Sequence, residues 1–273
     1  MKKIVISLSL ILFLGCNEAR QEGISFEDTN GSIIGGTRID PMSIPARSTV
    51  YVGLAYYKNG RPVQEARCSG VLVSRRAILT AAHCVDGATE VDYEKMQIYV
   101  AFGADISVPS NITVWATSGV KIHPDYSAEV AFGRRAPRDI AVVTIAKDAP
   151  FPFVPAQILT DYRLLELGEN LLVLGYGLSS VEPWELAKNL KSVSLPLAGI
   201  SHNSLELRGT SEENTCGGDS GGPIFANKNG NYYLVGTLVG EMIKDDRLPR
   251  CTQRIVITHL DYVKDFIAPY IQQ

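Results

Sequence analysis

Short strand-like runs separated by turn residues recur along most of this 273-residue chain. They are apolar or alternate between apolar and polar residues, which is the pattern of buried or half-buried β-strands. The clearest runs are 49–57, 70–73, 96–102, 112–117, 171–176, 192–197, 232–239 and 254–258. Their spacing favours antiparallel barrels. We therefore expect residues 33–273 to form one all-β unit, although that length would otherwise suggest two ordinary domains.

The C-terminal end follows a different period. Its apolar residues recur at the three- and four-residue spacing of one helix face. They are Leu260, Val263, Phe266, Ile267, Tyr270 and Ile271. We predict a C-terminal α-helix docked on the body of the protein.

The overall charge offers no case for a nucleic-acid partner, because the formal net charge is −3. The basic cluster of Arg134, Arg135 and Arg138 lacks interleaved aromatic residues, and we interpret it as a solvated loop. No Cys/His spacing typical of a metal site is present, so no metal ion is expected.

The first residues have the three regions of a secretory signal. Lys2 and Lys3 precede the apolar run 4–14, and Gly15 and Cys16 follow it. The run is too short to span a bilayer, which needs about 20 apolar residues. Residues 1–15 are therefore predicted to be a signal peptide, and the protein is predicted to be exported.

Glycines on both sides of one serine form the segment Gly217-Gly218-Asp219-Ser220-Gly221-Gly222, which Pro223 closes. Small neighbours leave the serine hydroxyl exposed and allow backbone N–H groups to converge on an incoming carbonyl. A phosphate-binding loop is the alternative, but the segment lacks the Gly-Lys-Ser/Thr ending of that motif. A serine nucleophile needs a nearby base and an acid that orients the base.

Both candidates lie upstream of Ser220. The base candidate is His83, within Thr80-Ala81-Ala82-His83-Cys84, and the acid candidate is Asp139, which opens Asp139-Ile140-Ala141-Val142-Val143. Taken alone, the histidine is more often a packed or surface residue, and the aspartate is more often a turn residue. Their order along the chain, His, Asp, Ser, is one in which this triad occurs.

The segments TAAHC, DIAVV and CGGDSGGP together resemble those of the chymotrypsin-like (trypsin-like) serine proteases. The resemblance implies two six-stranded antiparallel Greek-key barrels, with His83 and Asp139 from the first barrel and Ser220 from the second. It also implies that Ser220 is the nucleophile, His83 the base and Asp139 its orienting acid. The N–H groups of Gly218 and Ser220 would form the oxyanion hole, and no cofactor would be needed.

Five cysteines leave one without a partner if the others pair. The resemblance pairs Cys68 with Cys84 and Cys216 with Cys251, and disulfides of this kind persist in oxidising compartments. Residues 12–16, Leu-Phe-Leu-Gly-Cys, resemble a bacterial lipobox, which implies a bacterial lipoprotein with lipid on Cys16. The protein would then be anchored in the cell envelope or secreted. Ordinary signal cleavage that leaves a spare thiol is the alternative.

Residues 16–32 are polar and are predicted to form a tether or propeptide. The following Ile33-Ile34-Gly35-Gly36 resembles the N-terminus that is freed when zymogens of this family are cut. The new ammonium of Ile33 would then pair with Asp219 and shape the oxyanion hole. Because Ser32 precedes Ile33, a trypsin-like activator has no obvious site, so either another activating protease cuts after Ser32 or activation proceeds differently.

Substrate choice is less constrained. The resemblance places Asn214 at the base of the specificity pocket, with Val239, Glu241 and Ile255 around it. An inward-pointing Glu241 would favour basic side chains, and an outward-pointing one would favour small or medium apolar side chains.

The sequence thus predicts a serine endopeptidase that hydrolyses protein or peptide substrates through an acyl-enzyme and is made as a zymogen. One alternative is a binding or regulatory module that keeps the protease fold in a locked, inactive state. An esterase that uses the same acyl transfer is another.

Overall fold

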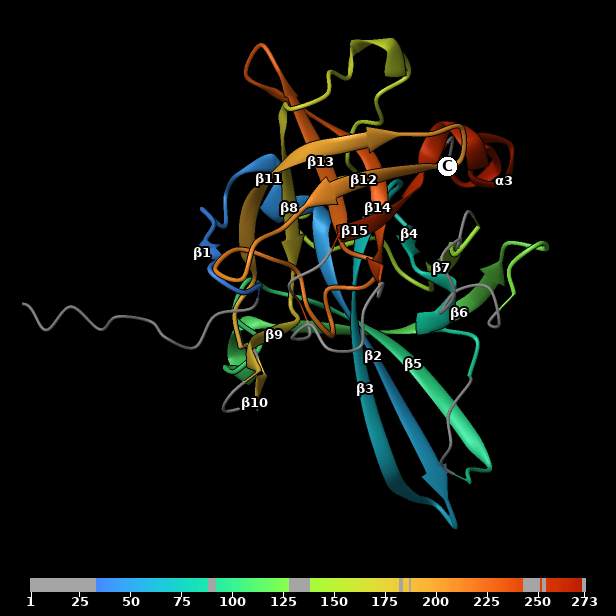
Figure 1. Cartoon of the computed structure of the whole chain (residues 1–273). Coiled ribbons are helices and arrows are strands. Elements are labelled where there is room, and N and C mark those ends of the chain that lie inside the picture. Colours follow the sequence, from blue (N-terminus) through green and yellow to red (C-terminus); the bar gives the residue numbers. More distant parts are fainter. Residues whose placement is uncertain are drawn as a thin grey trace, which may run out of the picture.

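The computed structural model describes residues 33–87, 92–127, 138–181, 184–186, 188–242, 251 and 254–271. The predicted signal peptide (1–15) and tether (16–32), with Cys16, lie outside this part of the chain, as do Arg134 and Arg135. The described residues form mainly β-strands, with short helical segments between them (Figure 1). None of the helices in these ranges is long and apolar enough to cross a membrane.

Six antiparallel strands close into a first barrel in the order β2-β3-β4-β7-β6-β5. They are β2 (Thr49–Lys58), β3 (Arg61–Leu72), β4 (Ala77–Thr80), β5 (Lys95–Phe102), β6 (Thr113–Ile122) and β7 (Ala141–Ile145). Aliphatic side chains from alternate strand positions, such as Val52 and Leu54, fill the interior together with Ile78 and Val143. This burial explains the alternating runs in the sequence.

A second barrel closes in the order β8-β11-β12-β15-β14-β13, because β11 pairs with β8 as well as with β12. Its strands are β8 (Asn170–Gly175), β11 (Lys191–Ile200), β12 (Ser204–Arg208), β13 (Pro223–Lys228), β14 (Asn231–Met242) and β15 (Arg254–His259). The short β1 (Thr37–Arg38) extends this sheet beside β11, and β9 (Leu178–Val181) pairs with β10 (Trp184–Leu186) as a separate hairpin. The interior is again aliphatic, with Leu171, Val173 and Ile257 fully buried.

A third apolar cluster joins the two barrels. It contains Tyr51 and Leu79 from the first barrel and Tyr176 and Phe225 from the side of the second. The rings of Tyr51 and Tyr176 meet edge to face with 5.8 Å between their centroids, and the Tyr176 hydroxyl donates to the carbonyl oxygen of Gly103 at 2.9 Å. This shared core fixes how one barrel sits against the other.

Short helices complete the fold: α1 (Ile44–Ser48) and the 3₁₀ turns η1 (Ala82–Cys84), η2 (Pro109–Asn111), η3 (Tyr162–Leu164) and η4 (Leu260–Val263). η4 leads into the C-terminal helix α3 (Lys264–Ile271). Leu260, Val263 and Ile267 are buried in the shared core, as their spacing predicts. The predicted fold, two six-stranded antiparallel barrels with a C-terminal helix, is confirmed.

One hairpin of the first barrel is longer than the sequence predicts. β3 begins at Arg61, whereas the strand-like run begins at residue 70. The loop between β2 and β3 is Asn59-Gly60, and both residues have positive φ, 52° and 72°, as the tightest hairpin turns require. The hairpin projects from the body with β5 lying along β2 (Figure 1).

Candidate active site

His83 lies in η1, directly after β4. Its neighbours Ala82 and Cys84 are buried, and a disulfide between Cys68 and Cys84 ties this turn to β3. The side chain of His83 itself is 20% exposed. The turn therefore holds the imidazole at the surface of the first barrel while its flanking residues anchor it in the core.

Asp139 precedes β7, and its carboxylate is completely buried. One carboxylate oxygen lies 2.6 Å from Nδ1 of His83, and the other accepts the backbone N–H of His83 at 2.9 Å. Because a carboxylate can only accept, Nδ1 donates to Asp139, and in the neutral ring this leaves the lone pair on Nε2. The hydroxyl of Thr258, on β15, donates to the backbone carbonyl of Asp139 at 3.2 Å and so links this residue to the second barrel.

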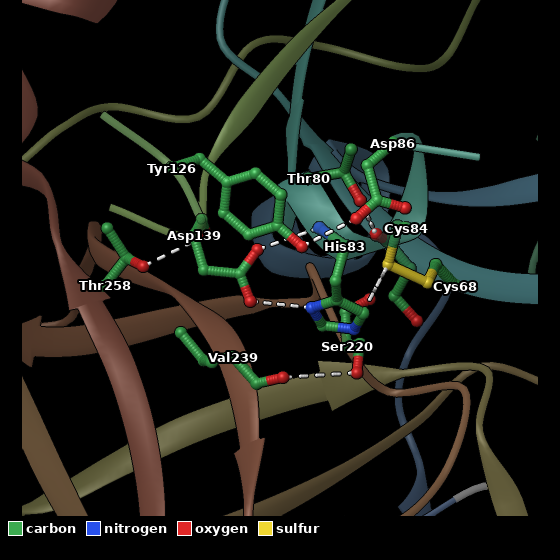
Figure 2. Close-up of polar contacts among 11 residues, drawn as sticks. Cys68, Thr80, His83, Cys84, Asp86, Tyr126, Asp139, Ser220, Val239 and Thr258 are labelled. Atoms are coloured by element: carbon green, nitrogen blue, oxygen red, sulfur yellow. Dashed lines mark hydrogen bonds and ion pairs between the residues drawn. A yellow bond between two sulfur atoms is a disulfide. The ribbon is translucent and has the colours of Figure 1, made fainter. Parts of the chain in front are cut away.

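Ser220 lies against the edge of the His83 ring that faces away from Asp139 (Figure 2). Its hydroxyl donates to the carbonyl oxygen of Val239 on β14 at 3.3 Å. Its own carbonyl oxygen accepts the backbone N–H of Ser69, on β3, at 2.8 Å. The nucleophile candidate is thus held between a strand of each barrel.

The glycines around Ser220 are required by space and by backbone conformation. Gly218 has φ +95°, and a Cβ at this position would lie 2.9 Å from the Cα of Gly177. Gly221 has φ +78°, and a Cβ there would lie 2.2 Å from the hydroxyl oxygen of Thr80. Residues with side chains would be strained at both positions.

Backbone N–H groups in this segment fall into two groups. Those of Asp219, Gly221 and Gly222 donate to the carbonyl oxygens of Cys216, Leu238 and Asp219. Within the described part of the chain, the N–H groups of Gly218 and Ser220 have no internal acceptor. They are available to a substrate oxygen, as the arrangement of an oxyanion hole requires.

Asp219 is completely buried, and its two carboxylate oxygens accept the N–H groups of Cys216 and Gly177 at 2.9 and 2.8 Å. Burial raises the pKa of Asp219 to about 7, although these two donors act in the opposite direction. A Cβ on Gly175 or Gly177 would collide with this carboxylate, which explains why glycine occupies both positions. The buried carboxyl is a site where a cation would relieve a desolvation penalty.

Ile33, the predicted new N-terminus, is 1% exposed and packs with the core of the second barrel. Its φ is +64°, in a region where a β-branched residue is strained. The next residue, Ile34, accepts the backbone N–H of Asn214 at 3.1 Å. The start of the described chain therefore lies beside the segment that leads to Ser220.

The four predicted pocket residues differ in position. Val239 contacts the Ser220 hydroxyl through its carbonyl, whereas Ile255 is fully buried in the core of the second barrel. Asn214 is also buried, and its amide nitrogen donates to the carbonyl of Thr210 at 3.4 Å. Glu241 belongs to β14, but its side chain lies outside the described structure. The pocket and its preference stay predictions.

Both expected disulfides are present, since Cys216 is joined to Cys251 as well as Cys68 to Cys84. Cys68, His83 and Cys84 are close enough together to suggest metal ligands. The two sulfurs are bonded to each other, however, and a disulfide offers no thiolate to a metal.

Sequence reasoning missed three residues that support the site: Ser69, Gly177 and Thr258. Each contacts its partner from a different strand or loop, and Ser69 lies 151 positions before Ser220. No local motif marks such contacts, because folding brings together residues that are far apart in the sequence. The contacts of Ser69 and Thr258 join the two barrels, and that of Gly177 lies within the second barrel, where β8 and β13 are neighbours.

Comparisons with known proteins agree with this geometry. The family model described as Trypsin matches residues 33–267. Brachyurin from Leptuca pugilator is 26% identical over 211 residues, which cover 74% of this chain and 84% of that protein. Chymotrypsin-like elastase family member 1 from Bos taurus is 27% identical over 254 residues, which cover 86% of each chain.

A larger relative matches only in part. Phenoloxidase-activating enzyme 1 from Spodoptera litura is 27% identical over 235 residues, which cover 77% of this chain but 60% of that protein. These three relatives are animal proteins, so the predicted bacterial origin stays a prediction. The matched range contains His83, Asp139 and Ser220 and both barrels, and the chain belongs to the trypsin-like serine protease family.

Proposed function

We propose that this protein is a serine endopeptidase with His83, Asp139 and Ser220 as its catalytic triad. The observation that carries the proposal is the position of His83, whose Nδ1 is 2.6 Å from the buried carboxylate of Asp139 while its other edge faces Ser220 (Figure 2). Nε2 can then accept the serine proton. Membership of a family whose members hydrolyse peptide bonds agrees with this role.

In the proposed reaction, Oγ of Ser220 attacks the carbonyl carbon of the scissile bond while Nε2 of His83 takes its proton. The N–H groups of Gly218 and Ser220 stabilise the resulting oxyanion. His83 then delivers the proton to the leaving amine, which leaves an acyl-enzyme on Ser220. Water repeats the sequence and restores the free hydroxyl.

We further propose that the protein is made as a zymogen and is activated by cleavage between Ser32 and Ile33. The ammonium of Ile33 would pair with Asp219, whose buried carboxyl has no cation among the causes of its raised pKa. Cleavage would also remove the strain at Ile33, because φ is no longer constrained once no carbonyl precedes the residue. An activator with a preference for serine before the cut, or for isoleucine after it, is expected from the sequence.

We also propose export to an oxidising compartment, which the two disulfides support. Lipid on Cys16 would anchor the uncut protein to a bacterial envelope, and cleavage before Ile33 would release the protease domain. Metabolic labelling with a fatty-acid analogue tests this step, because a Cys16→Ser variant would lose the label only if Cys16 carries the lipid.

A fluorophosphonate probe, which reacts with activated serines, tests the central proposal. It would be applied to the wild type and to Ser220→Ala, each as the full chain and as a form that starts at Ile33. We expect labelling of the Ile33 form with Ser220 only. Equal labelling of both lengths would refute zymogen activation. No labelling of folded, disulfide-bonded protein would favour the locked binding module, and hydrolysis of esters without peptides would favour an esterase.

A further inference from the structure

A tight turn after β7 carries Phe151, which at 90% exposure is the most exposed of the large apolar side chains in the described ranges. Pro150 and Pro152 flank it and restrict the backbone, and the N–H of Phe153 donates to the carbonyl of Pro150 at 2.9 Å. The ring of Phe153 packs against the first-barrel core and meets Phe102 edge to face, with 5.1 Å between the centroids. One phenylalanine thus anchors the turn, and the other projects from it.

Two arginines from other parts of the chain contact the backbone of this turn. Nε of Arg47, on α1, donates to the carbonyl of Pro152 at 2.6 Å. Nη2 of Arg75, in the loop between β3 and β4, donates to the carbonyl of Ala149 at 2.8 Å, and its side chain stays 49% exposed. Because a guanidinium has five N–H donors, each arginine keeps donors for a further partner.

The positive charge around Phe151 exceeds the negative charge. Arg76 pairs with Asp148 at 2.6 Å, and Arg75 lies 3.6 Å from the same carboxylate. Lys147 belongs to the same segment and is exposed. With the arginine on α1, four cations accompany one carboxylate, although the whole chain has a formal net charge of −3. We define the Phe151 patch as Phe151 with Arg47, Arg75, Arg76 and Lys147.

A second exposed apolar side chain lies beside the turn. Ile44 precedes Arg47 by three positions on α1, a spacing that places two side chains on the same face of a helix. Since Arg47 contacts Pro152, Ile44 lies on the side of α1 that meets the turn, and it is 44% exposed. The apolar surface is therefore wider than the ring of Phe151 alone.

The patch and the proposed catalytic residues lie at opposite ends of the same two strands. β4 runs from the arginine loop towards His83, and β7 runs from Asp139 towards the turn of Phe151. The two strands pair antiparallel along the whole length of β4, which at four residues spans about 13 Å. A flat surface that covered the patch would leave the ends at His83 and Asp139 uncovered.

We propose that the Phe151 patch binds the surface of an anionic lipid bilayer, with the ring of Phe151 among the lipids and the four cations at the headgroups. Anionic leaflets attract lysine and arginine side chains, and an apolar ring gains free energy by leaving water. A bilayer needs no matching cavity for a single projecting ring, whereas a stable protein interface needs a broad packed area. The inference goes beyond the proposed function, because it does not depend on the role of Ser220.

Flotation with lipid vesicles tests the proposal. The chain from residue 17 to 273 is used, because it keeps both barrels but lacks the predicted signal peptide and Cys16, which could themselves carry it to lipid. Vesicles of phosphatidylglycerol mixed with phosphatidylcholine are compared with vesicles of phosphatidylcholine alone. We expect binding to the anionic vesicles to be tighter by about tenfold or more and to weaken as salt is added. No binding, or equal binding to both kinds of vesicle, would overturn the proposal.

A matched pair of variants tests the projecting ring. Phe151→Ala should lower the partition coefficient on anionic vesicles about tenfold, because most of the apolar contact is lost. Leu167→Ala is the control, since Leu167 is also exposed, at 68%, but lies beside Glu166 and Glu169. We expect no change in this control. Unchanged binding of Phe151→Ala, or an equal loss in both variants, would contradict insertion at Phe151.

The charges are tested by a variant that should gain affinity. Asp148→Asn removes the carboxylate that pairs with Arg76, so binding to anionic vesicles should tighten about fivefold. Binding to neutral vesicles should stay unchanged. An unfolded variant would expose its core and bind both kinds of vesicle, so lipid selectivity separates the two causes. Unchanged or weaker binding to anionic vesicles would show that these cations do not meet the headgroups.

The orientation is tested by fluorescence quenching. Lipids with brominated acyl chains quench a tryptophan that enters the bilayer, and the native Trp115 and Trp184 give the background. We expect quenching above this background in Phe151→Trp but not in Leu167→Trp. Equal quenching in the two variants would refute the proposed orientation.

Discussion

The two halves of the proposed site are held by different physical means. The base half, His83 and Asp139, lies at the ends of β4 and β7 in the first barrel, and a disulfide closes it onto β3. The nucleophile half depends on glycines at positive φ and on Asp219, a fully buried carboxyl with a raised pKa. The first arrangement is set by strand pairing and by that disulfide. The second contains the carboxyl of Asp219, whose protonation state can change, so a switch between an inactive and an active state is more easily built into it.

The largest expected effect is in the base half. Asp139→Asn replaces an acceptor at Nδ1 of His83 by an amide that can present a donor there, so the imidazole takes the wrong tautomer. We expect kcat to fall by about 10⁴-fold with little change in fold. Ester hydrolysis measured against counted active sites checks this. A fall of less than tenfold would show that Asp139 does not orient the base.

Gly218→Ala tests the nucleophile half. Alanine at φ +95° is strained, and its Cβ would collide with Gly177, so the N–H of residue 218 must move. We expect kcat to fall by about 10²- to 10³-fold, the effect of one lost oxyanion donor. Gly217→Ala is the matched control, because its Cβ would meet only Leu178 at an ordinary 3.4 Å. Similar losses in both variants would count against a specific role of Gly218.

The switchable charge in the nucleophile half predicts a pH dependence of stability. The carboxyl of Asp219 has a pKa of about 7 in the folded chain and about 3.8 when unperturbed. Between these values the folded state binds more protons, so the free energy of unfolding of the uncut chain should fall as pH rises from 4 to 7. Denaturant titrations across this range measure the slope. Asp219→Asn should flatten this dependence of the unfolding free energy on pH. An unchanged slope in that variant would show that other titrating groups cause the dependence.

The smallest expected effect concerns the link between the halves. Thr258→Val removes the hydroxyl that donates to the backbone carbonyl of Asp139 but keeps the shape of the side chain. We expect a loss of about 0.5–1.5 kcal/mol in stability and a change in kcat of less than tenfold. Thermal unfolding and ester hydrolysis of the same samples check both. A hundredfold loss in kcat would mean that the second barrel positions Asp139 more strongly than the first.

The sequence predicted the elements whose signals are local. Apolar alternation located most barrel strands, and the three- and four-residue spacing located α3. β12 and β13 were missed, because Ser204–Arg208 is short and Pro223–Lys228 starts within the glycine-rich segment. The start of β3 was missed because Arg61–Arg67 is exposed or half-buried and lacks an apolar period, so pairing with β2 decides its structure.

In the candidate site, too, the residues with a local sequence signal were predicted and those that depend on distant contacts were not. The motifs indicated His83, Asp139 and Ser220 because each has a characteristic sequence around it. The contacts of Ser69 and Thr258 arise only when two closed barrels dock, and nothing near these residues in the sequence marks the partner.

The division of the proposed triad between two barrels has a consequence for how folding can be observed. Each barrel has its own core, and the chain crosses from one to the other between β7 and β8. Neither fragment from a break in that crossing would carry a complete triad. If the proposed triad is correct, hydrolysis reports on both barrels at once, because a turnover occurs only in molecules whose two barrels have both folded and docked. The protein could then serve as a split reporter.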